Sequence, residues 1–146
     1  MGLFSFIRKS QPGRVAETQL GAFTLAYSKR KRNIWTNRHG KFAMSVRGTE
    51  FAPDPEQLEF LQNIDGEIQS LNEKILKRFV DEFEKADLEI DFGSWQERFK
   101  LVAVQVTQMF KSEAYWDITF EDLKEPYDQF TLYIEGQNIT DFYVDK

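Results

Sequence analysis

Eight apolar residues recur at spacings of three and four between positions 58 and 83, with mostly charged and polar residues between them. This spacing is typical of a helix that presents one apolar stripe to a core. The stripe consists of Leu58, Leu61, Ile64, Ile68, Leu71, Ile75, Phe79 and Phe83. Asp54 and Gln57 match a capping box ahead of it, and Pro55 suits the first helical position. We therefore predict one long helix over residues 54–86, about 45 Å long at 1.5 Å per residue, with Gly66 as its weakest point.

On both sides of this helical segment the apolar residues alternate with other residues, which is typical of strands with one buried face. Residues 20–48 contain three such runs, separated by basic turns at residues 29–33 and 37–41. Residues 101–145 contain four more, and the turn at residues 135–138 predicts a hairpin between the last two. The sequence therefore predicts two antiparallel meanders, one before and one after the helix.

No linker is long enough to divide the chain. We expect a single α+β domain over residues 1–146, in which an antiparallel meander sheet packs against the long helix. A core-facing helix explains the stripe more simply than a coiled coil, the alternative for such a pattern. Residues 1–19 are expected to form a loosely held terminal segment, whose apolar start beside two basic residues also allows contact with a membrane surface. Ser94 and Glu97 match a second capping box and predict a short helical turn.

The net charge of −5 conceals a strong asymmetry along the chain. Residues 1–48 carry ten Lys and Arg against one acid, Glu17, whereas the rest of the chain carries nine Lys and Arg against 23 acids. Such a split indicates a charged partner. The alternative is that the two halves meet in one fold, where their charges partly pair with little energetic gain from each pair.

Composition also bears on the compartment and on the chemistry. Cysteine is absent, no apolar run approaches the roughly 20 residues that cross a bilayer, and no secretory signal is present, so we expect a cytoplasmic protein. The one histidine, His39, lies in a basic turn, where we expect it to be exposed and not part of a Ser-His-Asp triad. Zinc lacks its usual ligands, and no phosphate-binding glycine pattern occurs. We expect no cofactor and favour binding over catalysis.

Acidic residues gather around one strand end and the loop that follows it. They are Asp117, Glu121, Asp122, Glu125 and Asp128, with Asp141 and Asp145 on the last strand. Paired carboxylates can hold Mg²⁺ or Ca²⁺ or divide into acid and base, but the spacing matches no EF-hand. We expect the first five to form a surface that binds a basic protein, because complementary charge speeds association and selects the partner.

The first basic turn is the competing candidate site. Trp35 adjoins a run of four cations, Lys29, Arg30, Lys31 and Arg32. Cations interleaved with an aromatic ring suit phosphate contacts and base stacking. The sequence pI of about 5.0 argues against a dedicated nucleic-acid-binding protein. The alternatives for this turn are a solvated loop and contact with an acidic protein.

Three stretches carry a resemblance to a known group. Residues 20–25 read Leu-Gly-Ala-Phe-Thr-Leu with Trp35 in the next strand, residues 117–122 read Asp-Ile-Thr-Phe-Glu-Asp, and residues 130–134 read Phe-Thr-Leu-Tyr-Ile. With these stretches the chain resembles a group of uncharacterised bacterial domains, the DUF 2262-like group. Members often carry Gly-His before the penultimate strand, where this chain has Pro-Tyr-Asp-Gln at residues 126–129, so no role of that histidine carries over. The resemblance implies an α+β domain, and some such proteins look like immunity proteins that neutralise a toxin.

The sequence thus favours a non-enzymatic binding protein, of the immunity-inhibitor type, that uses an acidic surface against a basic protein. One alternative is a nucleic-acid or phosphate-binding module that uses the basic turn. The other is a carboxylate-based hydrolase, which requires the acids to share one face.

Overall fold

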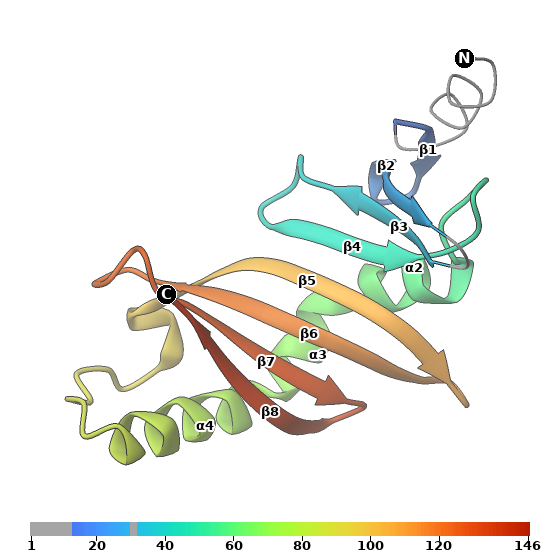
Figure 1. Ribbon diagram of the computed structural model, residues 1–146. Coiled ribbons are helices and arrows are strands. Elements are labelled where there is room, and N and C mark those ends of the chain that lie inside the picture. The colour runs from blue at the N-terminus through green and yellow to red at the C-terminus, as the bar shows by residue number, and fades with distance from the viewer. Residues whose placement is uncertain (1–12, 30–31) are drawn as a thin grey trace.

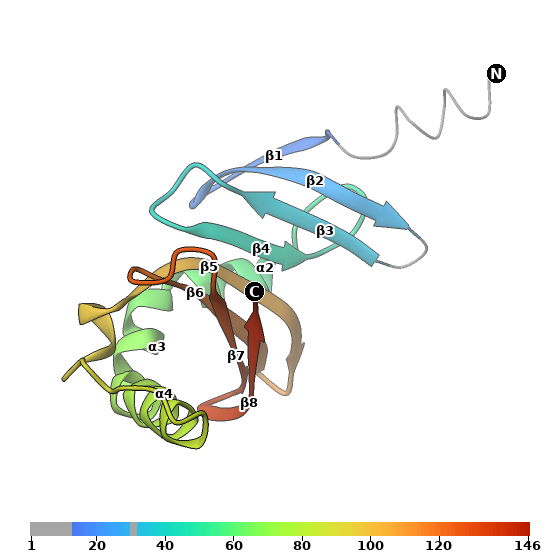
Figure 2. The ribbon, with the colours of Figure 1, turned by 60° about the vertical axis from the view of Figure 1, so that its left-hand side comes forward.

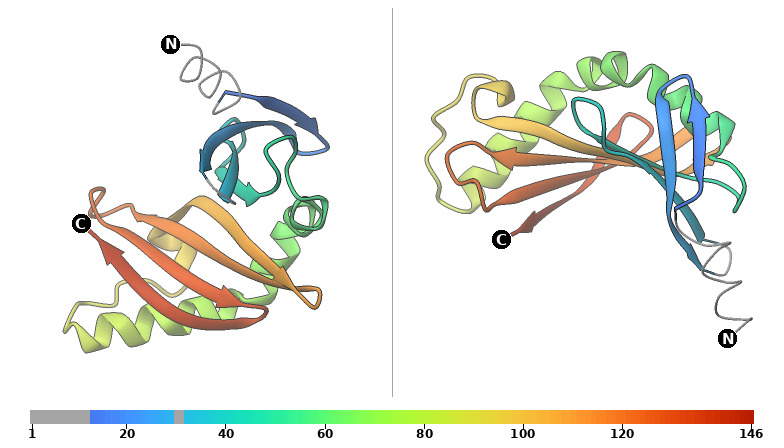
Figure 3. Two further views of the ribbon diagram at one scale, coloured as in Figure 1. Left: turned by 45° about the vertical axis from the view of Figure 1, so that its right-hand side comes forward. Right: turned by 90° about the horizontal axis from the view of Figure 1, so that it is seen from above.

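The computed structural model describes residues 13–29 and 32–146, and its dominant element is one sheet. Within these ranges eight strands lie side by side in the order of the sequence, from β1 to β8 (Figure 1). The sheet twists strongly, so that its first strands run across the direction of its last four (Figure 3). The architecture agrees with an α+β fold, although the sheet dominates it.

The first strands form the predicted meander, with one strand more than expected. Three strands pair antiparallel as their alternation predicts: β2 (Gly21–Lys29), β3 (Arg32–Asn37) and β4 (Ala43–Arg47). A further strand, β1 (Val15–Thr18), pairs antiparallel with β2, so part of the segment that we expected to be loosely held is an edge strand. The sequence of this strand shows little alternation of apolar and polar residues, because within β1 only Ala16 is an apolar residue packed partly against the core. Residues 1–12 lie outside the described ranges.

The prediction of one long helix over residues 54–86 is wrong. The structure has three consecutive helices: α2 (Pro55–Gln62), α3 (Ile64–Ser70) and α4 (Asn72–Lys85). The breaks fall at Asn63 and Leu71, where ψ is 16° and 0°, and not at Gly66. The helices follow the curved sheet as an arc (Figure 2), because a straight rod would leave the twisted face at its ends. None of the helices in the described ranges is long and apolar enough to span a membrane.

The start of α2 is as predicted, apart from one hydrogen bond. Oδ2 of Asp54 accepts from the backbone N of Gln57 at 3.0 Å, and Pro55 lies in the first turn. The side chain of Gln57 does not complete the capping box. Its Oε1 accepts from the backbone N of Arg47 at 2.8 Å, so this buried amide joins α2 to β4.

The two meanders join through one parallel pair of strands. The helices carry the chain across one face of the sheet, so β5 begins beside β4 and runs parallel to it. The acidic meander that follows is antiparallel, as predicted: β5 (Phe99–Phe110), β6 (Glu113–Asp122), β7 (Gln129–Glu135) and β8 (Asn138–Asp145). The wholly antiparallel sheet that we expected is therefore interrupted at its centre.

The helices and the sheet enclose a core rich in aromatic rings. Phe79 of α4 is fully buried and stacks on Phe99 of β5, with ring centroids 4.0 Å apart. Three further rings meet Phe79 edge to face, with centroids 5.3 to 5.7 Å away: Phe120, Phe130 and Phe142. The helices cover only this face of β5–β8, and no described helix lies on the opposite face, which we call the open face (Figure 2).

An ion-pair network closes one end of this core. The predicted short turn is the 3₁₀ helix η1 (Trp95–Glu97), and Arg98 follows it with a side chain that is only 13% exposed. Two guanidinium nitrogens of Arg98 donate to the two carboxylate oxygens of Asp122, at 3.0 and 2.9 Å. The third donates to Asp91 at 3.0 Å, and Lys124 also pairs with Asp91. The network fastens the loop before η1 to the ends of β5 and β6.

Candidate functional site

The open face of the sheet carries a polar row that crosses six strands. The strand registers place one residue from each of β3 to β8 side by side: Thr36, Ser45, Gln105, Asp117, Tyr133 and Asp141. Their sequence neighbours, such as Trp116 and Ile118, point to the other face and are buried in the core. The row therefore occupies the face that the helices leave uncovered.

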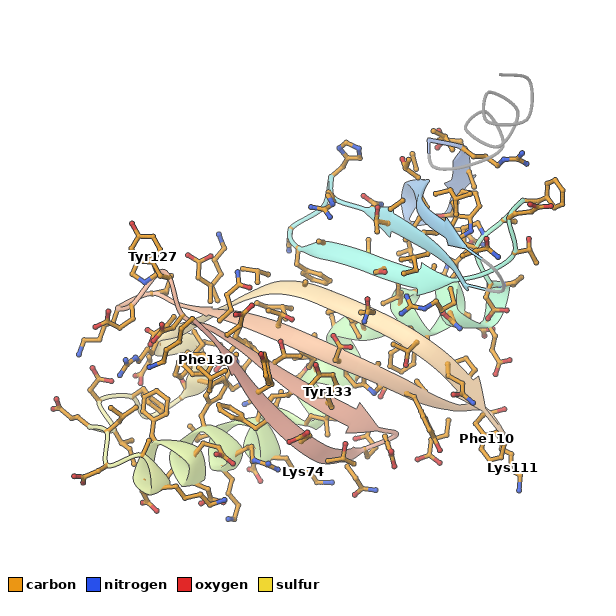
Figure 4. The ribbon with its side chains drawn as sticks, viewed as in Figure 1. Lys74, Phe110, Lys111, Tyr127, Phe130 and Tyr133 are labelled. Atoms are coloured by element: carbon orange, nitrogen blue, oxygen red, sulfur yellow. The ribbon has the colours of Figure 1, made fainter. Side chains whose placement is uncertain are left out.

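Small side chains beside this row leave a hollow of about 470 Å³ on the open face. A second row, two residues along the strands, consists of Ala43, Ala103, Thr119 and Thr131. Side chains this short leave space above the sheet, and Ala26 of β2 extends it. Arg38 from the β3–β4 turn and Tyr133 complete the walls, and Figure 4 shows Tyr133 along β7, away from the hairpin tips that bear Phe110 and Lys111.

Asp117 is the carboxyl group of the hollow, and it is 8% exposed. Nε2 of Gln105 donates to its Oδ2 at 3.2 Å. Burial raises the pKa of Asp117 to about 6, and the hydrogen bond from Gln105 and the charge of Arg47 offset this only in part. Asp117 therefore changes its charge close to neutral pH, which is typical of groups at functional sites.

Further polar groups line the hollow. The buried hydroxyl of Ser45 has no hydrogen-bond partner within the described part of the chain. The hydroxyls of Thr119 and Thr131, in contrast, pair with each other at 3.1 Å. Burial, followed by the charges of Asp117 and Asp141, raises the pKa of Tyr133, whose ring is 41% exposed. A buried polar atom without a partner destabilises the folded state, as does a buried charge whose desolvation is only partly offset. The hydroxyl of Ser45 is of the first kind and the carboxylate of Asp117 of the second, so neither is explained by a contribution to stability.

Replacing Asp117 by asparagine is expected to stabilise the protein above pH 6 and to change little near pH 4. The folded-state pKa of about 6 lies above the value of 3.8 for an unperturbed carboxyl, so the folded state binds more protons between these values. Stability therefore falls as the pH rises through this window, by on the order of 3 kcal/mol in total, and asparagine avoids that loss. Urea unfolding of both proteins at pH 4 and pH 8 measures the effect. An equal difference at the two pH values would contradict the assignment.

The structure does not bring the five predicted acidic residues onto one surface. Asp117 and Glu121 lie on the open face, because four residues separate them along β6. Asp122 points the other way, is 1% exposed and is held by Arg98, so it stabilises the fold. Glu125 and Asp128 belong to the loop between β6 and β7, where the backbone N of Asp128 donates to the carbonyl of Glu125.

A different set of acids shares the open face with two tyrosines. The registers place Asp141 beside Tyr133, and Asp145 beside Gln129, which in turn neighbours Glu121. Tyr143 lies between Asp141 and Asp145 on the same face of β8 and is 55% exposed. We name the following residues the acidic–tyrosine face: Glu121, Tyr133, Asp141, Tyr143 and Asp145.

The basic turn falls largely outside what the structure describes. Arg30 and Lys31 lie outside the described residues, and for Lys29 and Arg32 the structure describes the backbone, which forms the end pair of β2 and β3. Trp35, the ring expected to stack on a base, is fully buried, and its Nε1 donates to the carbonyl of Thr49 at 2.9 Å. A ring without exposed surface cannot stack on a nucleotide, so the expected role of Trp35 is replaced by a role in the core.

Three further chemistries were considered from the sequence: a Ser-His-Asp triad, a metal site and a carboxylate-based hydrolase. His39 is exposed in the β3–β4 turn, where its backbone N donates to Oδ1 of Asn37 at 2.9 Å. In residues 13–29 and 32–146, no group of three or more His, Cys, Asp or Glu side chains is arranged to hold a metal ion. Four of the acidic residues considered for a hydrolase share the open face, Asp117, Glu121, Asp141 and Asp145. The registers place Tyr133 between Asp117 and Asp141, and Gln129 between Glu121 and Asp145, so these carboxylates are not direct cross-strand neighbours.

The sequence predicted a site role for Asp117 but not for its neighbours at the hollow, Ser45, Gln105 and Tyr133. Alternation assigns each of them to a strand face, but it does not say which residues become neighbours across strands. The row depends on five separate registers, including the parallel pair β4–β5. No signal in the sequence fixes that pair, because a long helical crossover lies between its strands.

Comparison with known proteins adds no relative to these observations. No family model matches the chain, and neither a curated protein nor a solved structure matches it.

Proposed function

We propose that this protein is a non-enzymatic binding protein that holds a basic protein partner against the acidic–tyrosine face. The observation that carries the proposal is the uncovered face of β6–β8, where Glu121, Asp141 and Asp145 surround two exposed tyrosines. The helices pack on the opposite face of the same strands (Figure 2). One face of this sheet thus stabilises the fold, and the other is available to a partner.

The chemistry of the acidic–tyrosine face suits a basic protein. Tyrosine is enriched in interfaces because it buries a large rigid ring and keeps a hydroxyl for hydrogen bonding. The carboxylates around the rings attract cations over a Debye length of about 8 Å at physiological salt. In addition, β8 is the last strand of the sheet, so its outer backbone groups can pair with an extended segment of the partner.

An immunity-type inhibitor that covers the basic cleft of a toxin is the form of this function that the sequence resemblance favours. The two alternatives have weaker support. The nucleic-acid-binding module loses its stacking ring, because Trp35 is buried. The hydrolase has only separated carboxylates on the open face, because Tyr133 lies between Asp117 and Asp141, and Gln129 lies between Glu121 and Asp145.

Reversing three charges on the acidic–tyrosine face is expected to abolish tight partner binding. The tagged wild-type protein would first capture its partner from a nuclease-treated native lysate, and mass spectrometry would identify a stoichiometric basic protein. Calorimetry with the purified partner would then compare the wild type with a variant carrying Glu121→Lys, Asp141→Lys and Asp145→Lys. We expect Kd to rise at least about 100-fold, because the variant opposes like charges across the interface. The affinity of the wild type should also fall as salt is added.

A matched control variant distinguishes an effect of the acidic–tyrosine face from an effect of the net charge. The substitutions Glu59→Lys, Glu73→Lys and Glu84→Lys change the net charge equally but lie on exposed positions of the helices. This control should bind the partner within about threefold of the wild type. Equal loss in both variants, or an unchanged Kd in the face variant, would contradict the proposal.

A further inference from the structure

The hollow beside the acidic–tyrosine face contains both signs of charge, which the proposed function does not use. Asp117 and Arg38 both line it. Three strand spacings, about 14 Å at 4.8 Å each, separate Asp117 from Thr36, which lies two residues before Arg38. The positive and negative groups therefore approach the hollow from opposite sides, with its small side chains between them.

The Asp117 side of the hollow suits a protonated amine. Gln105 donates to Oδ2 of this carboxyl, which is 8% exposed. A buried carboxylate is stabilised by a cation that reaches it, and an ammonium group supplies both the charge and hydrogen-bond donors. The ring of Tyr133 stands on the neighbouring strand, where it can contact the same cation through its face.

The opposite side of the hollow suits a carboxylate. Arg38 extends from the exposed β3–β4 turn, and its side chain lines the hollow. A guanidinium group recognises a carboxylate through two parallel hydrogen bonds. Between the strands that carry the two charged ends lie Ala43 of β4 and Ala103 of β5, whose methyl groups suit a short apolar spacer.

We infer that the hollow binds a small zwitterion, with its ammonium group at Asp117 and Tyr133 and its carboxylate at Arg38. An amine alone would leave Arg38 without a partner from the ligand, and an anion alone would face Asp117. The chemical class that meets both ends is an amino acid whose amine and carboxylate are separated by a short methylene chain. The hollow shares Tyr133 with the acidic–tyrosine face, but its two charged residues, Asp117 and Arg38, lie outside that face, so the inference does not depend on the proposed function.

Titration of the full chain with single- and double-charged probes tests this inference. The ¹⁵N-labelled protein at pH 8, where Asp117 is ionised, would be titrated with ω-amino acids from glycine to 6-aminohexanoate. Butylamine and butyrate serve as the probes with one charge. We expect at least one zwitterion to bind about tenfold tighter than either single-charge probe, with amide shifts concentrated around Ser45, Gln105 and Asp117. If no zwitterion binds tighter than butylamine, or if the shifts lie elsewhere, the inference is overturned.

Two variants test which residue binds the ammonium group of the ligand and which binds its carboxylate. Asp117→Asn should weaken zwitterion binding at least tenfold and leave butyrate unaffected, whereas Arg38→Gln should weaken it similarly and leave butylamine no weaker. The controls Asp141→Asn and Lys41→Gln remove the same charges from a position two strands along the row and from the same turn, outside the lining of the hollow. They should bind within about twofold of the wild type.

These variants also keep the result separate from folding and from the proposed function. Asp117→Asn removes a charge that destabilises the folded state, so its folding is not at risk. An unchanged zwitterion affinity in Asp117→Asn, or an equal loss in Asp141→Asn, would overturn the inference. The probes contain no protein partner, so the charge-reversal experiment on the acidic–tyrosine face can fail or succeed independently.

Discussion

Replacing Arg98 by methionine is expected to lower the free energy of unfolding by about 3–5 kcal/mol. Arg98 holds both oxygens of Asp122, whose side chain is 2% exposed, and it also lies over the rings of Phe83 and Phe99. Methionine keeps much of the apolar contact but leaves Asp122 as a buried charge without its counter-ion. Urea unfolding at pH 7 measures the difference.

Two further variants separate the buried pair from the exposed part of this network. Asp91→Asn removes the partner on the outer side of Arg98, and we expect it to cost less than about 1 kcal/mol, as for a surface ion pair. Adding Asp122→Asn to Arg98→Met should restore at least about 1 kcal/mol, because the unpaired charge is then removed. If the double variant is no more stable than Arg98→Met, the loss comes from packing and not from the charge of Asp122.

Replacing Phe79 by alanine is expected to destabilise the protein by a similar amount, about 3–5 kcal/mol. Phe79 is the ring on which the helices and the sheet meet, since it stacks on Phe99 and contacts three more rings edge to face. Alanine removes these contacts and leaves a cavity in a core that is fixed on both sides by the sheet and by α4. Denaturant unfolding followed by tryptophan fluorescence measures the change.

The exposed ring of Tyr127 provides the control for Phe79. It is 90% exposed in the loop between β6 and β7 (Figure 4), so Tyr127→Ala should change stability by no more than about 0.5 kcal/mol. If Phe79→Ala cost less than about 1 kcal/mol, the ring cluster would not be the central contact between helices and sheet.

The local patterns of the sequence predicted most elements of the fold. Alternation located three strands of the first meander and the four of the second, and the cap at Asp54 and the turn after Ser94 occur where they were expected. Patterns of this kind succeed because each depends on residues a few positions apart. The short edge strand β1 was missed, since it buries too little apolar surface to produce alternation.

The shape of the helical region depended on long-range packing. The apolar stripe is continuous in the sequence, and nothing in it marks Asn63 or Leu71 as a break. The chain bends there because the stripe must stay in contact with a sheet that curves away from a straight axis, and Leu71 is fully buried at the second bend. A helical pattern in the sequence thus records which side faces the core, but not the curvature of the surface it packs on.

The same distinction applies to the candidate sites. By itself the sequence determined the strands β2 to β8, their apolar faces, the charge asymmetry and the absence of cysteine. Only the tertiary structure decided that Asp122 is buried against Arg98, that Trp35 is in the core, and that Asp117 lines a hollow. The physical reason is that alternation fixes the face of a side chain through local geometry, whereas its neighbours are set by strand registers and by burial, which depend on residues far apart in the chain.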